Sequence, residues 1–142
     1  MVTTSPYFHR QRRCAPIRGN FGPEQVVIFA EIGNLADLTQ LMFLGLNRNR
    51  VGDLSPLGHL VELATLALYQ NDISDVSPLA DPTGLTVLNL NSNSISDVSP
   101  LAKLTHLVEL GLSHNRISDV TVLLGLTNLQ MLTLVNNEDI LM

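Results

Sequence analysis

Several residue types that define common classes of protein are scarce in this sequence of 142 residues, which has one cysteine, one lysine and no tryptophan. Because Cys14 stands alone, no intrachain disulfide can form. No apolar run approaches the ~20 residues that a membrane-spanning helix requires. The longest run, residues 26–30, is also too short for the apolar part of a secretory signal. The chain as written therefore predicts no membrane span and no export signal, which favours the cytoplasm.

Positive charge is also scarce, and half of it lies near the N-terminus. The sequence has 8 basic and 13 acidic side chains, and charged residues make up 15% of it. Residues 1–24 hold four arginines and one glutamate, so residues 25–142 are strongly acidic. Neutralising the phosphates of a nucleic acid needs clustered lysine and arginine. The composition therefore argues against nucleic-acid binding.

The sequence does not bring together groups that could carry catalysis or hold a cofactor. It has no glycine-rich phosphate loop and no cysteine and histidine spacing typical of a metal site. Ser113 and His114 come closest to a nucleophile with its base, but neighbours on a strand point to opposite faces. We therefore predict a protein that is not an enzyme and has no cofactor.

What the sequence has in abundance is leucine in a periodic pattern. Residues 85–104 read LTVLNLNSNSISDVSPLAKL, and the same spacing recurs on both sides. The asparagine of this pattern returns every 22 residues, at Asn49, Asn71, Asn93, Asn115 and Asn137. Such spacing is typical of a leucine-rich repeat. It divides the chain from residue 38 onward into repeats 38–59, 60–81, 82–103, 104–125 and a truncated 126–142.

The repeat predicts an α/β solenoid. In each repeat two leucines of an L-x-L core, such as Leu88 and Leu90, predict a short strand whose leucines point inward. Stacked repeats then form a right-handed coil with a parallel β-sheet on its concave face. On the convex face, pairs such as Ser99-Pro100 predict a short 3₁₀ or irregular segment with the serine as N-cap.

Both ends depart from the repeat. Residues 1–24 contain three prolines and two glycines, which predicts a disordered tail, with an arginine-rich targeting peptide as the alternative. Residues 25–37 match the second half of a repeat and predict a degenerate N-terminal cap. No return segment covers the last leucine layer, formed by Leu129, Leu132 and Leu134. We therefore expect a fragment of a longer protein or an end covered by another chain.

The 22-residue period also creates two polar columns. The repeated asparagines fall at the bend that leaves each strand, where a buried amide can bond to the backbone of its own and the adjacent turn. We predict that they form a structural ladder. The second column consists of Asp53, Asp75, Asp97 and Asp119. Stacked carboxylates could attract Ca²⁺, but local Asx turns account for them without a metal, and we predict no metal site.

Positions between the inward leucines are the candidates for binding a protein partner. They include a largely apolar row and two aromatic side chains, and aromatic residues dominate interface hot spots. Small residues at Gly45, Ala67 and Gly111 predict that a partner can approach the backbone closely. The alternative is that these are scattered surface residues that bind nothing. The predicted partner-binding residues are Phe43, Asn47, Tyr69, Val87, Asn89, Asn91, Glu109, Ser113 and Met131.

The wording of the repeats supports a more specific comparison. Residues 73–120, which read ISDVSPLADPTGLTVLNLNSNSISDVSPLAKLTHLVELGLSHNRISDV, resemble the repeats of the bacterial internalin family. Those repeats read close to ISDISPLANLTNL, and the resemblance covers residues 38–137. It implies a curved leucine-rich solenoid that binds a protein through its concave face, on the cell surface or secreted if the chain is a fragment. The export signal, helical cap, immunoglobulin-like domain and wall anchor of that family are not recognisable here.

The repeat length is also similar to that of the eukaryotic leucine-rich regulatory subunit of protein phosphatase 1, whose repeats typically lack the Ser-Pro-Leu-Ala wording. Two functional hypotheses follow. The first is a non-enzymatic protein-binding module within a larger internalin-like surface protein. The second is an intracellular regulatory subunit of an enzyme such as protein phosphatase 1.

Overall fold

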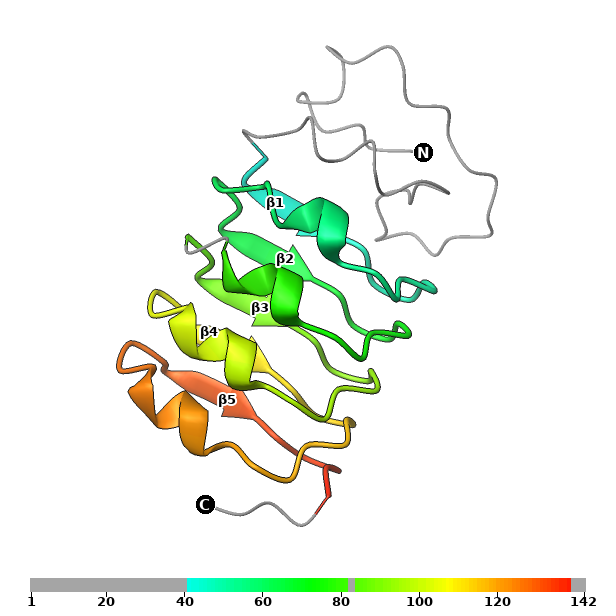
Figure 1. Ribbon diagram of the computed structural model, residues 1–142, viewed down its shortest axis with the longest axis vertical. Helices are drawn as coiled ribbons and strands as arrows, with labels where there is room; N and C mark the ends of the chain where they lie inside the picture. The colour runs from blue at the N-terminus through cyan, green and yellow to red at the C-terminus, as the bar shows by residue number, and fades with distance from the viewer. Residues whose placement is uncertain (1–40, 82–83, 139–142) are drawn as a thin grey trace.

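The computed structural model describes residues 41–81 and 84–138. Short parallel strands lie side by side in one 5-stranded open sheet, and 3₁₀ turns run along the other side of the stack (Figure 1). The predicted tail at 1–24 and the predicted cap at 25–37 lie outside the described residues. The elements are β1 (Phe43–Gly45), η3 (Ser55–Leu57), β2 (Thr65–Ala67), η4 (Ser77–Ala80), β3 (Val87–Asn89), η5 (Ser99–Lys103), β4 (Glu109–Gly111), η6 (Thr121–Gly125) and β5 (Met131–Thr133).

Each strand pairs with the next strand along the sequence, and the register advances by one whole repeat. Leu66, for example, pairs with Leu88, which in turn pairs with Leu110. These central leucines are almost wholly buried. Because side chains on a strand alternate between its two faces, the flanking residues of each strand face away from the core. The predicted leucine-rich solenoid with a parallel sheet is confirmed.

The 3₁₀ turns occur where the Ser-Pro pairs predicted them, but the predicted serine N-cap is wrong. The residue before each turn is apolar, such as Val98, and makes no side-chain cap hydrogen bond. Val98 is buried in the core, so the cap position has no room for a polar side chain. Ser99 is instead the first residue of the turn, and its N–H donates to Asp97 Oδ1 at 2.8 Å. The aspartate therefore does the capping from two residues upstream.

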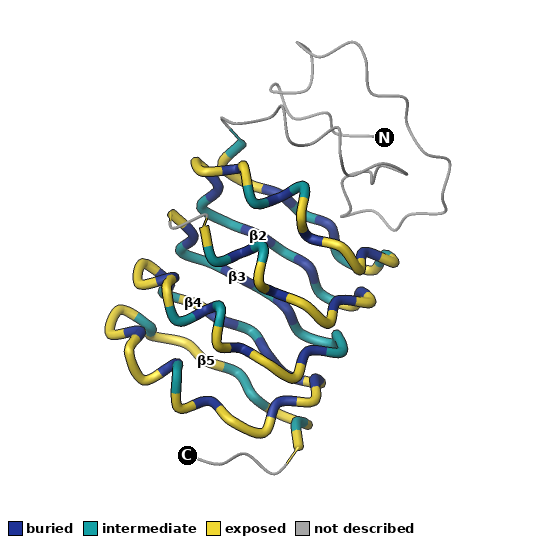
Figure 2. Tube along the Cα trace, in the orientation of Figure 1, coloured by how far each residue is buried: buried dark blue, intermediate teal, exposed yellow. Residues whose placement is uncertain are grey.

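One continuous apolar core fills the space between the sheet and the turns. Figure 2 shows buried positions recurring in β1 to β4 and in the turns of the stack. The turns contribute one wholly or nearly buried leucine each, at Leu57, Leu79, Leu101 and Leu123. The last layer is less well covered, since Leu132 is 38% exposed whereas its neighbour Leu110 is 1% exposed.

The bend after each strand places a residue in the left-handed region of the backbone. Five residues spaced 22 apart have φ between 54° and 57°, and none of them is glycine. The N–H of each of the first four donates to a carbonyl of the next repeat, as Ser92 does to Ser113 at 2.8 Å. Inter-repeat hydrogen bonds therefore hold a conformation that costs a non-glycine residue roughly 1 kcal/mol or more. The five residues are Arg48, Gln70, Ser92, His114 and Asn136.

Candidate protein-binding surface

The outward positions of the five strands and of the residues just after them form one surface, here called the sheet face. Its residues are aligned in three rows because each strand pairs with the next in the same register. The first row is Phe43, Thr65, Val87, Glu109 and Met131; the second is Gly45, Ala67, Asn89, Gly111 and Thr133; the third is Asn47, Tyr69, Asn91, Ser113 and Val135.

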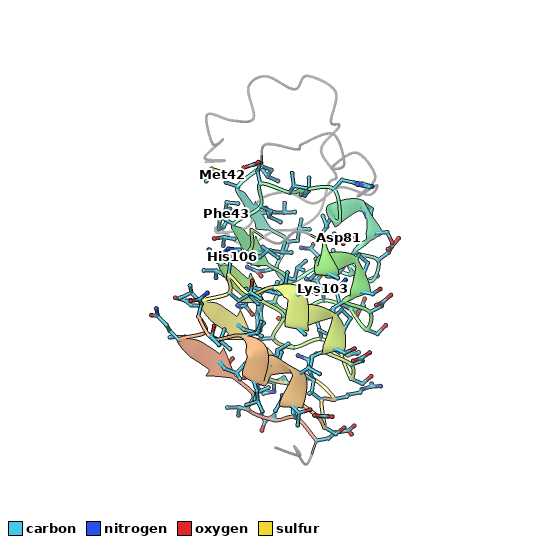
Figure 3. All side chains as sticks on the ribbon, turned by 60° about the vertical axis from the view of Figure 1, so that its left-hand side comes forward. Met42, Phe43, Asp81, Lys103 and His106 are labelled. Carbon is cyan, nitrogen blue, oxygen red and sulfur yellow. The ribbon has the colours of Figure 1, made fainter. Side chains whose placement is uncertain are left out.

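The two ends of the sheet face carry exposed apolar side chains. Phe43 on β1 is 59% exposed, and at the other end Met131 on β5 and Val135 are 55% and 65% exposed. Figure 3 shows Phe43 beside Met42 on the sheet side of the molecule, and Asp81 and Lys103 on the side of the 3₁₀ turns. Exposed apolar side chains of this size are favourable contact points for another protein.

Tyr69 lies near the centre of the third row and is partly covered by a cation. The guanidinium carbon of Arg48 stands 5.8 Å from the centroid of the Tyr69 ring. This distance is within the range of a cation–π contact, which at exposed sites contributes about 0.5–1 kcal/mol. The contact orders the ring while leaving the residue half-buried, so Tyr69 keeps surface available for a partner.

Polar residues of the third row are tied to the backbone of the next repeat. The side-chain oxygen of Asn47 accepts the N–H of Tyr69 at 2.8 Å, and that of Asn91 accepts the N–H of Ser113 at 2.7 Å. The Ser113 hydroxyl does the same for Val135 at 3.1 Å. The predicted ladder did not include this second set of inter-repeat bonds, although the side-chain acceptors at Asn47, Asn91 and Ser113 in one row were the available signal.

This arrangement changes the expectation for Ser113. The sequence predicted an outward side chain that contacts a partner, but Ser113 is only 9% exposed. Its hydroxyl is drawn against the backbone because it accepts the Val135 N–H. Ser113 therefore offers a partner little surface, and its neighbour His114 points elsewhere, within 3.2 Å of the Asn136 side-chain nitrogen.

Asn89, the last residue of β3, and Asn91, two positions later, form a hydrogen bond within one repeat. Tyr69 stands where Asn47, Asn91 and Ser113 stand in other repeats, and a phenol ring cannot accept the N–H of Asn91. The Oδ1 of Asn89 accepts that N–H instead, at 3.1 Å. The side chain two positions earlier on the strand thus compensates for the aromatic residue in the preceding repeat.

The two glycines of the sheet face differ in the space above them. A Cβ added at Gly111 would lie 2.7 Å from Asn91 Nδ2 and 3.1 Å from Asn89 Oδ1. A Cβ at Gly45 would meet the Phe43 ring at 3.5 Å. The expectation that small residues let a partner approach the backbone is therefore wrong at Gly111, which the chain's own asparagines cover. At Gly45 the Phe43 ring lies at an ordinary contact distance, and the expectation stays a prediction.

The column of repeated asparagines bonds to the backbone of two consecutive repeats. Asn93 Nδ2 donates to the carbonyls of Leu90 and Leu68, each at 3.0 Å, and Asn93 Oδ1 accepts the N–H of Ile73 at 3.1 Å. Asn71, Asn115 and Asn137 make the equivalent three contacts. These side chains face the interior of the bend, so they organise the stack and do not present themselves to a partner.

The aspartate column lies on the side of the 3₁₀ turns and forms Asx-type contacts. In each case Oδ1 accepts the N–H of the residue two positions later at 2.8 Å. Hydrogen bonds from the side chain and backbone of Ser99 lower the pKa of Asp97 from its ordinary value of 3.8. No group of three or more His, Cys, Asp or Glu side chains that could hold a metal occurs within 41–81 and 84–138. Nor does that part of the chain contain a helix long and apolar enough to cross a membrane.

Comparison with known proteins agrees with this architecture. The family profile described as "Leucine Rich repeats (2 copies)" matches residues 83–125. No curated protein sequence gives a significant match. Internalin C2 from Listeria monocytogenes has a TM-score of 0.71 and 34% identity over 76% of this chain and 48% of that one. An internalin, inlF, from the same species has a TM-score of 0.62 and 35% identity over 75% of this chain and 38% of that one.

A third similar structure is a plant peptide hormone receptor in complex with RGF2. It has a TM-score of 0.67 and 28% identity, over 74% of this chain and 18% of the receptor chain. The described part of the chain thus has the fold of a leucine-rich repeat protein. Among proteins of this class it resembles the internalins, and it spans less than half the length of the two internalin structures. Leucine-rich repeat proteins are generally binding modules without enzymatic activity.

Proposed function

We propose that the protein is a non-enzymatic binding module whose sheet face engages a protein partner. The observation that carries the proposal is the exposure of Phe43 and Met131, each more than half exposed, at the two ends of one continuous face. Tyr69, ordered by the Arg48 guanidinium, supplies an aromatic contact between these two ends. Large apolar and aromatic side chains of this kind supply most of the binding energy in protein interfaces.

Two further observations support the proposal. The plant receptor that is similar in fold was solved in complex with RGF2, so one protein that contains a comparable stack of repeats binds a partner. Glu109 is the only charged side chain among the residues of the sheet face, which offers no basic cluster for phosphate groups. The likeness to internalins favours the more specific proposal that this unit forms the binding part of an internalin-like surface protein.

The test compares partner capture by the wild-type protein and by a sheet-face variant. The variant Phe43→Ala with Tyr69→Ala removes both aromatic contacts and leaves the Asn47–Tyr69 backbone hydrogen bond possible. Leu124→Ala serves as the control, because Leu124 is 82% exposed but belongs to η6 on the other side of the stack. We expect captured partners to be lost with the double variant and retained with the control. Retention of every partner by the double variant would show that the sheet face is not the binding surface.

A further inference from the structure

The sheet face presents hydrogen-bond donors from three carboxamides, one in the first repeat and two in the central repeat. The side-chain oxygens of Asn47, Asn89 and Asn91 each accept a backbone N–H, from Tyr69, Asn91 and Ser113 respectively. An N–H can only be met by the oxygen of an amide, so these contacts determine which way each amide points. The Asn91 oxygen also accepts from the Thr133 hydroxyl at 3.3 Å.

The nitrogen atoms of these three amides make no hydrogen bond to any other described residue, although each residue is only half-buried. Asn91 Nδ2 lies directly above Gly111, where a side chain would displace it. The amides therefore act toward a partner as donors, because their acceptor atoms are used within the chain. A surface that offers fixed donors selects a partner that offers acceptors.

The negative charge of the face and its surroundings favours neutral acceptors over anionic ones. Glu109 on β4 belongs to the same face, and the described part of the chain has nine acidic side chains against four basic ones. Carboxylate and phosphate ligands would be repelled by this field. Neutral carbonyl oxygens would not be repelled, and the most abundant source of these in a protein partner is the main chain of an extended segment.

The apolar ends of the face fit the dimensions of such a segment. Four strand-to-strand steps separate β1 from β5, which at ~4.8 Å per step is about 19 Å. An extended chain advances ~3.3 Å per residue, so about six residues cross the face. A segment with two apolar side chains at that separation would place one near Phe43 and the other near Met131.

We propose that the sheet face binds one extended peptide segment of a partner protein, lying across the strands. Its main-chain carbonyls accept hydrogen bonds from the Nδ2 groups of Asn89 and Asn91, and apolar side chains about six residues apart contact Phe43 and Met131. This inference rests on the proposed function and adds to it the chemical class of the partner. It also predicts that the segment carries no acidic residue at its centre.

The experiment uses a displayed library of random 12-residue peptides, selected on the full chain and then synthesised for calorimetry. Two variants, Asn89→Asp and Asn91→Asp, keep the acceptor oxygen that each backbone N–H needs and replace the donor nitrogen by oxygen. Gln70→Glu makes the same change of atom and charge beside the face, at an exposed residue. Asn91→Ser is the neutral test, since Ser113 already fills the same role in the next repeat.

We expect the selected peptides to carry paired apolar residues and to bind about tenfold or more weakly to Asn89→Asp, Asn91→Asp and Asn91→Ser, with Gln70→Glu near wild type. The side-chain amide proton signals of Asn89 and Asn91 should shift on binding. If Phe43→Ala with Tyr69→Ala abolishes binding but the asparagine variants do not weaken it, the donor assignment is wrong and the proposed function stands. If neither the aromatic double variant nor the asparagine variants weaken binding, the donor assignment and the sheet-face binding surface are both wrong for these peptides. A library that yields no enriched peptide contradicts the extended segment itself, and the capture experiment then tests the proposed function independently.

Discussion

The Oδ1 atom of Asn89 accepts the backbone N–H of Asn91 at 3.1 Å, just after β3 and within one repeat. Elsewhere in this row the corresponding N–H groups of Tyr69, Ser113 and Val135 are met by a side chain of the preceding repeat. The exception follows from Tyr69, whose ring cannot accept the bond. Asn89, 20 positions after Tyr69, therefore replaces the acceptor that Tyr69 lacks. The same hydrogen bond fixes the orientation of the Asn89 amide nitrogen.

Replacing glycine by alanine is expected to lower stability at Gly111, which lies against Asn89 and Asn91, and to raise it at Gly45, which does not. In Gly111→Ala the new Cβ meets Asn91 Nδ2 at 2.7 Å and displaces an amide that holds Ser113 and Thr133. We expect it to lower the free energy of unfolding by about 1 kcal/mol, the value of one hydrogen bond. Gly45→Ala is the control, because its Cβ meets the Phe43 ring at an ordinary 3.5 Å.

Gly45→Ala should raise the free energy of unfolding by up to about 1 kcal/mol, because alanine restricts the unfolded chain. Urea unfolding of both variants, monitored by circular dichroism, measures the difference. Equal effects at the two positions would mean that the amide above Gly111 moves away freely and is not held in place.

The column of repeated asparagines predicts a graded cost for its removal. Asn93→Leu leaves the Ile73 N–H and the carbonyls of Leu68 and Leu90 without their side-chain partner. A buried group left without a partner costs about 1–3 kcal/mol, so we expect a loss of at least about 3 kcal/mol and a sharply lower melting temperature.

Asn49→Leu provides the comparison within the same column. The side chain of Asn49 donates to two carbonyls of its own repeat, at 2.9 Å and 2.7 Å, and makes no inter-repeat hydrogen bond among the described residues. Its loss should therefore be clearly smaller. An unchanged melting curve for Asn93→Leu would refute a stabilising role for the column.

The features that could be predicted from residue type and spacing are those that repeat. Leucine positions, parallel strands and 3₁₀ turns all follow from the 22-residue period, because every repeat meets the same neighbours. The serine N-cap was wrong because the buried apolar residue before each turn, such as Val98, takes that position. Orientation of the Asn89 and Asn91 amides was not predictable, since it depends on which residue stands 22 positions earlier and on the absence of a Cβ at Gly111.

The left-handed bends predict an unusual tolerance for glycine. Ser92 has φ of 57°, a conformation that glycine adopts without strain and that a β-branched residue strongly resists. Ser92→Gly should leave the free energy of unfolding within about 1 kcal/mol of wild type, whereas Ser92→Val should lower it by about 1–3 kcal/mol. Urea titration of the pair measures this difference, and the reverse order of stability would contradict the backbone geometry at this bend.

The aspartate column predicts loss of stability in acid. Hydrogen bonds from the following serine or threonine lower the pKa of Asp53, Asp75, Asp97 and Asp119 below 3.8 in the folded protein. A group whose pKa is lower in the folded state binds more protons when unfolded. Its stabilising contribution is therefore complete above the unfolded pKa and is lost as pH falls through the folded one. We expect the urea midpoint to be flat from neutral pH to about 5 and to fall below about pH 4.

Replacing all four aspartates by asparagine isolates their contribution, because asparagine keeps the Oδ1 acceptor and cannot titrate. The fourfold variant should show a smaller fall in urea midpoint between pH 7 and pH 3 than the wild type. Asp72→Asn with Asp81→Asn is the control, since those carboxylates accept no hydrogen bond within the described part of the chain. Asp75 also lies close enough to Asp53 and Asp97 for their charges to oppose the lowering of its pKa. Added salt screens this repulsion, so it should raise the stabilising contribution of the column at neutral pH. An identical acid response in the fourfold variant and the wild type would assign the loss to other carboxylates and leave the column with a geometric role alone.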